Sequence, residues 1–195
     1  NPPEDFPKII EAEKSWPIFY HFSPLRTNII DWIPFRKTDK VLEIGSGCGA
    51  VSGALAKRAG SVTCIDLSKK RSMVNAYRNR NADNITIMVG NFKDIEPHLD
   101  KDYDYVLLIG VFEYGQAYIG GVSPYEDFLR ICDRHRKLDG RLVIAIENKF
   151  GLKYWAGCRE DHLGTYFSGL EGYHAGGSAR TFTRRGLECI MERVG

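Results

Sequence analysis

The residues best suited to chemistry surround a glycine-rich stretch, Gly45, Gly47 and Gly49, that directly follows an apolar run. Glycine permits positive φ angles and lets a ligand approach the backbone closely. A helix that begins after such a loop presents free amides and a partial positive charge to a carboxylate or phosphate. Glu43 adds a carboxylate before the loop, and Asp66 ends the next apolar run, where an acceptor-only side chain suits two vicinal hydroxyls. The pattern predicts a site for a charged, nucleotide-like ligand.

These residues need strands and helices that bring them together, and the hydrophobic pattern predicts such a scaffold. Apolar runs typical of strands alternate with amphipathic segments typical of helices. Strands are expected at 40–44, 61–65, 85–89, 105–109 and 141–146, and helices at 24–33, 50–59, 69–79, 124–137 and 183–194. We expect an Asp139-Gly140 turn before the last strand. The predicted fold class is α/β, a Rossmann-like parallel sheet with helices on both faces.

Composition excludes several classes of protein. The chain has 195 residues, is 43% hydrophobic and carries a formal net charge of +2, which suits one globular domain rather than a disordered chain. The balanced charge disfavours nucleic acid as a partner, and no apolar run approaches the roughly 20 residues that span a bilayer. The 5 cysteines include no CxxC pair, which predicts reduced thiols in a cytoplasmic protein and no metal site.

One domain is expected to cover residues 1–195, with a loosely attached segment at 1–14. Residues 148–180 show no clear periodicity but are rich in glycine and aromatic residues, which predicts a lid or substrate-binding insertion. The chain begins with Asn1 and ends at Gly195, directly after a helical pattern. We therefore expect a piece of a longer polypeptide, whose other domains are candidate partners.

The stretch from Val41 to Ala50 resembles motif I of the class I S-adenosylmethionine-dependent methyltransferases, and later landmarks follow the family's order. The resemblance implies S-adenosylmethionine as cofactor, with Asp66 on the ribose and Leu67 and Phe92 against the adenine. The family's sheet ends with a sixth and a seventh strand, and this chain stops before them. The implied cofactor-binding residues are Glu43, Gly45, Ser46, Gly47, Gly49, Asp66, Leu67, Asn91, Phe92, Gly110 and Phe112.

The acceptor of the methyl group is predicted less directly. The insertion resembles methyltransferase domains of bacterial surface-polysaccharide biosynthesis, which implies transfer to an oxygen of a saccharide or small metabolite. A hydroxyl nucleophile needs a general base, and Glu147 and His162 are the preferred candidates, with Glu113, His174 and His21 as alternatives. Expected substrate-binding residues in the insertion are Asn148, Tyr154 and His174.

Two other functions remain open. Gly45-x-Gly47-x-x-Ala50 also fits a relaxed dinucleotide fingerprint, so an oxidoreductase that uses NAD or a nucleotide sugar is one alternative. The Tyr-x-x-x-Lys pair of short-chain dehydrogenases is absent from the sequence. The other alternative is a module that binds the cofactor without catalysis, because Asn91 and Tyr114 depart from the family pattern.

Overall fold

The computed structural model describes residues 5–173, 177 and 179–195, which form two compact units. Unit 1 comprises Asn1–Leu107 and His135–Leu142, and unit 2 comprises Leu108–Arg134 and Val143–Gly195. Across the described part of the chain, no helix combines the length and apolar character needed to cross a membrane.

Within the described residues one five-stranded sheet has the order β3-β2-β1-β4-β5. Its strands are β1 (Lys40–Ile44), β2 (Ser61–Asp66), β3 (Ile85–Val89), β4 (Tyr103–Ile109) and β5 (Arg136–Ala145). β1 pairs with β2 and β2 with β3 in parallel. The predicted α/β class is confirmed, and the carboxyl ends of β1 and β2 lead into the loops that carry the predicted ligand residues.

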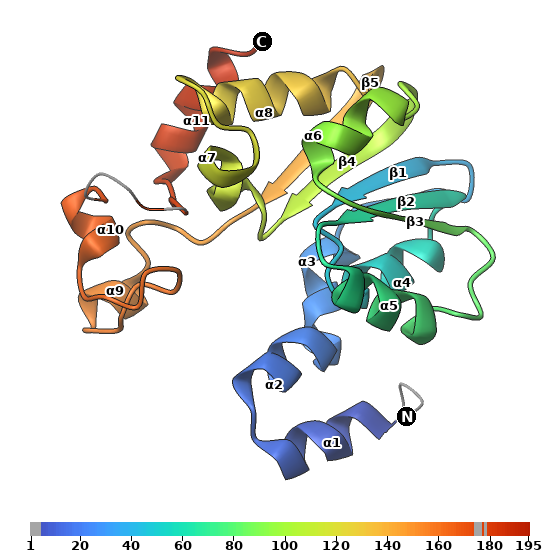
Figure 1. The fold of residues 1–195 in the computed structure, drawn as a ribbon, viewed down its shortest axis with the longest axis horizontal. Helices are drawn as coiled ribbons and strands as arrows, with labels where there is room; N and C mark the ends of the chain where they lie inside the picture. The colour runs from blue at the N-terminus through green and yellow to red at the C-terminus, as the bar shows by residue number, and fades with distance from the viewer. Residues whose placement is uncertain (1–4, 174–176, 178) are drawn as a thin grey trace. The chain divides into compact units, whose positions relative to one another are not determined.

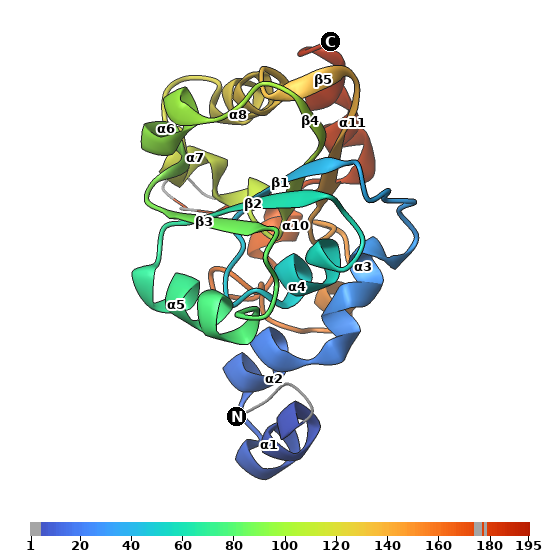
Figure 2. The ribbon, with the colours of Figure 1, turned by 90° about the vertical axis from the view of Figure 1, so that its right-hand side faces the viewer.

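Helices cover both faces of the unit 1 strands, as Figures 1 and 2 show. On one face lie α4 (Ala50–Ala56) and α5 (Lys69–Arg78), and on the other lie α6 (Phe92–Ile95) and the short 3-10 helix η3 (Glu96–His98). Each fully buried aliphatic side chain contributes about 1.5–3 kcal/mol to stability. The most buried side chains of these elements include Leu42, Leu55, Val62 and Ile65.

The N-terminal part of unit 1 forms α1 (Phe6–Glu13), α2 (Trp16–Phe22), η2 (Pro24–Thr27) and α3 (Asn28–Asp31). The Arg78 guanidinium on α5 lies 5.0 Å from the ring centre of Phe6 and donates to His21 O at 2.8 Å. The described part of the segment expected to be loose therefore contains a helix that packs against α5.

Unit 2 is built around an aromatic core. Its helices are η4 (Phe112–Tyr114), α7 (Gly115–Tyr118), α8 (Pro124–Asp133), α9 (Leu152–Trp155), α10 (Ser168–Glu171) and α11 (Arg184–Glu192). The Phe112 ring packs against Tyr125, Phe128 and Phe182 at centroid distances of 5.4, 5.9 and 5.8 Å. This core anchors the segment after β4 and the start of α11.

The expected boundary between α8 and β5 is wrong. The helix ends at Asp133, and β5 begins at Arg136, so the predicted Asp139-Gly140 turn lies inside a strand. The buried His135 explains the difference, because its ring contacts Asp100 O at 2.6 Å and its own carbonyl accepts from Tyr103 N at 3.0 Å. These long-range contacts draw the chain into the sheet before the expected turn. The residues of β5 are half-buried or exposed.

Asp104 offers a test of how the strands of unit 1 are held together. Its Oδ2 accepts from Lys40 N and its Oδ1 from Lys137 Nζ, both at 2.8 Å. Burial raises the pKa of Asp104, but these two hydrogen bonds outweigh burial and lower it below its usual range. The carboxylate therefore stabilises the fold at neutral pH, and this contribution is lost as the pH falls through the lowered pKa.

We expect Asp104→Asn to reduce the free energy of unfolding by about 1–3 kcal/mol at pH 7, because hydrogen bonds to a charged group are lost. The deficit should shrink toward pH 3. Urea denaturation at several pH values measures it. Asp127→Asn is the matched control, since Asp127 pairs with Arg130 on an exposed helix surface and should change stability by under about 1 kcal/mol. Equal losses from the two variants would contradict the prediction.

Candidate active site

The glycine loop after β1 continues the hydrogen bonding of the sheet. Gly45 N and Ser46 N donate to Ile65 O of β2 at 2.8 and 3.0 Å. Gly45, Gly47 and Gly49 have φ angles of 78°, 53° and 76°. These left-handed angles cost other residues about 1–2 kcal/mol each, which explains why the loop needs glycine at alternate positions.

Asp66 fixes this loop to the end of β2. It is 3% exposed, and its Oδ2 accepts from Gly47 N at 2.8 Å. Its Oδ1 accepts from Ser68 N at 2.8 Å and pairs with the Arg71 guanidinium at 3.2 Å. Each carboxylate oxygen can accept more than one hydrogen bond. Asp66 can therefore hold the loop and still accept from a ligand hydroxyl.

Two glycines of the loop differ in the space beside them: Gly47 has free space, and Gly49 has none. A Cβ atom built on Gly47 would meet nothing within 4 Å, whereas one built on Gly49 would lie 2.2 Å from Asn75 Oδ1 of α5. Ser46 Oγ is buried and has no hydrogen-bond partner among the described residues. An open backbone position next to an unsatisfied buried hydroxyl is what a ligand-binding loop requires.

Glu43 belongs to a buried network beneath the loop. It is 3% exposed, and its Oε2 accepts from Ser52 Oγ at 2.5 Å and from Cys64 Sγ at 3.5 Å. Asn75 Nδ2 in turn donates to Ser52 Oγ at 3.1 Å. Desolvation raises the pKa of Glu43 to about 7, although the Ser52 and Cys64 hydrogen bonds oppose this. A cation bound nearby would favour the ionised form.

The other predicted cofactor residues lie in different surroundings. Leu67 is 54% exposed and available to a ligand, whereas Phe92 is 6% exposed and belongs to the core. Asn91 is the N-cap of α6, and its side chain accepts from Lys93 N. In unit 2, Gly110 has a φ of 65°, and Phe112 is wholly buried in the aromatic core. The side chains of Phe92 and Phe112 therefore pack inside the protein.

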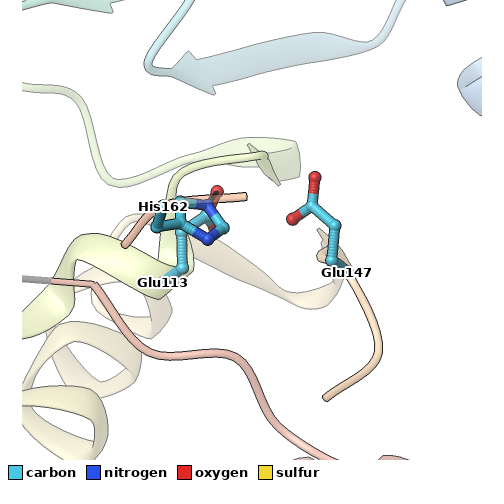
Figure 3. Close-up of side chains that lie close together, drawn as sticks. All are labelled: Glu113, Glu147 and His162. Carbon is cyan, nitrogen blue, oxygen red and sulfur yellow. Dashed lines mark ion pairs between the residues drawn. The ribbon is translucent and has the colours of Figure 1, made fainter. Parts of the chain in front are cut away.

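Unit 2 brings together three of the base candidates, Glu113, Glu147 and His162 (Figure 3). A carboxylate oxygen from each glutamate and one imidazole nitrogen lie within 4.8 Å of one another. His162 Nε2 is 3.6 Å from Glu113 Oε1, an ion-pair distance too long for a hydrogen bond. Oε2 of Glu113 and Oε2 of Glu147 are both buried without a hydrogen-bond partner among the described residues.

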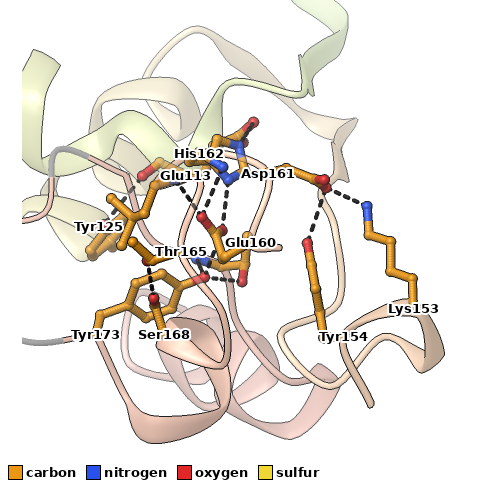
Figure 4. Close-up of polar contacts among 12 residues, drawn as sticks. Glu113, Tyr125, Lys153, Tyr154, Glu160, Asp161, His162, Thr165, Ser168 and Tyr173 are labelled. Atoms are coloured by element: carbon orange, nitrogen blue, oxygen red, sulfur yellow. Dashed lines mark hydrogen bonds and ion pairs between the residues drawn. The ribbon is translucent and has the colours of Figure 1, made fainter. Parts of the chain in front are cut away.

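A second carboxylate, Glu160, fixes the other side of the His162 ring (Figure 4). Glu160 Oε1 contacts His162 Nδ1 at 2.9 Å and accepts from Tyr173 Oη at 3.2 Å. Its Oε2 accepts from the backbone of His162 and Leu163 at 2.8 and 2.7 Å. The Glu113 carboxylate, assisted by Glu160, raises the pKa of His162 to about 9 against the opposing effect of burial.

Two of the predicted substrate residues, Tyr154 and Asn148, form hydrogen bonds within the protein. Tyr154 is 3% exposed, and its hydroxyl donates to Asp161 at 3.0 Å. Asn148 is exposed, forms a bridge with Phe182, and its side chain accepts from Phe150 N. His174 lies outside the described residues.

Glu160 was missed by the sequence analysis. Its position two residues before His162 is the one local signal that points to it. The contact with Tyr173 cannot be inferred from that spacing.

Comparison with known proteins places these features in a family. Residues 42–144 match the family described as "Methyltransferase domain". A Methanococcus maripaludis relative named "Probable cobalt-precorrin-6B C(15)-methyltransferase (decarboxylating)" is 33% identical over 114 residues, which cover 56% of this chain and 55% of the relative. This chain spans about half the length of the curated relatives it matches.

Solved structures show the same fold. A chain of the Haloferax volcanii complex between the Trm112 methyltransferase activator and a methyltransferase superposes with a TM-score of 0.65 at 17% identity, over 98% of this chain and 76% of that one. A Geobacter sulfurreducens S-adenosylmethionine-dependent methyltransferase, solved with S-adenosylhomocysteine, gives a TM-score of 0.56 at 19% identity, over 88% and 62%. At such low sequence identities, these similarities support a shared fold and not a shared function.

Two alanine substitutions separate the two roles of glycine in the loop. Gly47→Ala should lower the free energy of unfolding by about 1–2 kcal/mol, because only the left-handed φ is penalised. Gly49→Ala should lower it by about 2–4 kcal/mol, because its methyl group also collides with Asn75. Urea denaturation of both variants measures the difference. Equal losses would show that the Asn75 contact yields without cost.

The buried Glu43 carboxyl predicts a dependence of stability on pH. Its pKa in the fold is about 7 against a usual 4.5, so the native state binds more protons than the unfolded chain between these values. Stability contributed by Glu43 therefore falls as the pH rises through this window. Glu43→Gln removes this titration, so its stability relative to the unsubstituted protein should rise by on the order of 1–3 kcal/mol from pH 5 to pH 8. If the stabilities of the two proteins changed with pH in parallel, the raised pKa of Glu43 would be contradicted.

Proposed function

This chain belongs to the methyltransferase-domain family, and we propose that it transfers the methyl group of S-adenosylmethionine to an oxygen of a saccharide or small metabolite. The observation that carries the proposal is the open, unsatisfied loop at Ser46 and Gly47, which follows β1 and is held by Asp66. When bound, the cofactor supplies a methyl group activated on a sulfonium.

The residues of unit 1 fit this cofactor. The Ser46 hydroxyl and the open backbone at Gly47 offer polar groups to its amino-acid part. The Asp66 carboxylate has further acceptor capacity for ribose hydroxyls. The exposed Leu67 offers an apolar surface to the adenine. The Glu43 carboxylate supplies a negative charge beneath the loop, which favours the cationic side of the ligand.

The residues of unit 2 fit a hydroxyl acceptor. A hydroxyl must lose its proton as its oxygen gains the methyl group, so a base increases the rate by roughly 10²–10⁴-fold. Glu147 Oε2 is buried without a partner among the described residues and is the group we assign to accept that proton. His162 holds a proton at neutral pH, because its pKa is about 9. We therefore assign it to balance and orient the carboxylates rather than to act as the base.

Exposed aromatic side chains of the insertion favour an acceptor with a flat, partly apolar face. Trp155 is 63% exposed, Tyr166 53%, and Phe150 and Phe167 46% each. Such side chains stack on sugar rings and similar groups. The Methanococcus relative is named for methylation at a carbon, so a carbon acceptor is the second candidate, and it would make the Glu147 base dispensable.

The cofactor assignment is tested by calorimetric titration of residues 1–195 with S-adenosylhomocysteine, with NADH as the alternative ligand. We expect binding of S-adenosylhomocysteine alone, in the micromolar range. Asp66→Asn should weaken it about tenfold or more, since a hydrogen bond to a charged group is worth about 1.5–3 kcal/mol and 1.4 kcal/mol is tenfold.

Asp83→Asn is the matched control, because Asp83 is exposed and should leave binding unchanged. Thermal unfolding of each variant shows whether the fold survives. Binding of NADH without S-adenosylhomocysteine would overturn the proposal in favour of an oxidoreductase. Unchanged affinity in Asp66→Asn would overturn the ribose contact.

A further inference from the structure

We propose that Glu113, Glu147 and His162 form a site for a divalent cation of borderline hardness, such as Mn²⁺ or Zn²⁺. The inference deepens the proposed function and rests on it: the cation would bind the hydroxyl oxygen of the methyl acceptor. Two carboxylates and one imidazole are the donor set that such ions take, and three protein ligands leave positions open for a substrate.

The first argument is the convergence of the ligand atoms. One oxygen from each glutamate and one nitrogen of His162 lie within 4.8 Å of one another (Figure 3). Two ligands bound at about 2.0–2.2 Å to one ion are at most about 4.4 Å apart. Shifts of the side-chain ends by less than about an ångström would therefore close the site, and the 3.6 Å separation of His162 Nε2 from Glu113 Oε1 already falls in this range.

The second argument is charge that the protein leaves unsatisfied. Glu113 is 2% exposed, yet its Oε2 accepts no hydrogen bond from the described residues, and the same holds for the buried Oε2 of Glu147. A buried carboxylate oxygen without a partner costs stability. The His162 ring lies 3.6 Å from Oε1 of Glu113 and contacts Glu160 through its other nitrogen, so it leaves both Oε2 atoms without a partner among the described residues. A divalent cation would compensate both unsatisfied carboxylates.

The third argument is the orientation of the imidazole. His162 Nδ1 contacts the buried Glu160 at 2.9 Å, which leaves Nε2 directed toward Glu113 (Figure 4). Metal-binding histidines commonly donate their second N–H to a carboxylate, which fixes the tautomer and the ring orientation. Glu160 is itself held by two backbone amides and Tyr173. The ligand nitrogen is therefore positioned before any ion arrives, and an ion that binds there would displace the proton from Nε2.

A bound cation would also assist the proposed transfer. The acceptor oxygen forms a bond to the methyl carbon while the carbon–sulfur bond breaks. The electron pair of the carbon–sulfur bond stays on the sulfur atom. The hydroxyl proton leaves to the free oxygen of Glu147 or to water. Coordination of the acceptor oxygen lowers its pKa, so that this proton leaves more easily.

The test is a calorimetric titration of chelator-treated chain 1–195 with MnCl₂ and, separately, ZnSO₄. We expect one ion per chain, with a rise in melting temperature on binding. His162→Ala and Glu147→Gln should each lose at least about tenfold in affinity, and Glu160→Gln, which keeps all three ligands, about 10–100-fold. The exposed His98→Ala and Glu188→Gln are matched controls and should bind the ion as the unsubstituted chain does.

Titration of the same samples with S-adenosylhomocysteine separates the two proposals. If the chain binds this ligand but neither ion, or binds an ion equally well after His162→Ala and Glu147→Gln, the cation site is overturned and the cofactor assignment stands. Binding of an ion that requires His162 and Glu147 supports the site even if S-adenosylhomocysteine fails to bind. If a variant loses ion binding but still binds S-adenosylhomocysteine, the loss did not result from unfolding.

Discussion

The hydrogen bond from Gly47 N to the buried Asp66 carboxylate is the constraint on which the cofactor loop depends. Strand β2 satisfies the amides of Gly45 and Ser46 through Ile65 O, but the Gly47 amide is bonded by a side chain, that of Asp66. Asp66 supplies that acceptor from the end of the neighbouring strand, and the parallel pairing of β1 with β2 determines where it lies. The same carboxylate that is suited to a ribose therefore also builds the loop that receives the rest of the ligand.

Local patterns were sufficient to predict the first three strands of the sheet but not α1, α2 or α6. β1 and β3 have the predicted bounds, and β2 extends one residue further, because each is a short run rich in β-branched and apolar residues. Ser68 and Thr183 cap α5 and α11 with their side chains, so α5 begins at the predicted residue and α11 begins one residue later than predicted. The error at β5 arose from His135, whose partners lie more than 30 residues away.

The site was predictable only in part, for a related reason. Glycine spacing and strand-end acids are local signals, so the loop and Asp66 could be identified in advance. Phe92 and Phe112 were assigned to the ligand by resemblance, whereas the packing of the aliphatic and aromatic cores draws their side chains inward. The arrangement of Glu113, Glu147 and His162 depends on three separate segments of unit 2. No spacing along the chain encodes such a convergence.

Unit 2 satisfies its buried carboxylates unequally: Glu160, in the insertion, is fully bonded, whereas Glu113 and Glu147, which follow β4 and β5, are not. Glu160 receives hydrogen bonds from two backbone amides, an imidazole and a phenol, so this loop is able to satisfy a buried carboxylate fully. Glu113 and Glu147 lie on the other side of the same imidazole and each keep an oxygen that accepts nothing from the described residues. A structural role would favour the first arrangement, because an unsatisfied buried charge reduces stability. The second arrangement is understandable where the carboxylates bind a proton, an ion or a substrate, so this contrast supports the roles that we propose for Glu113 and Glu147.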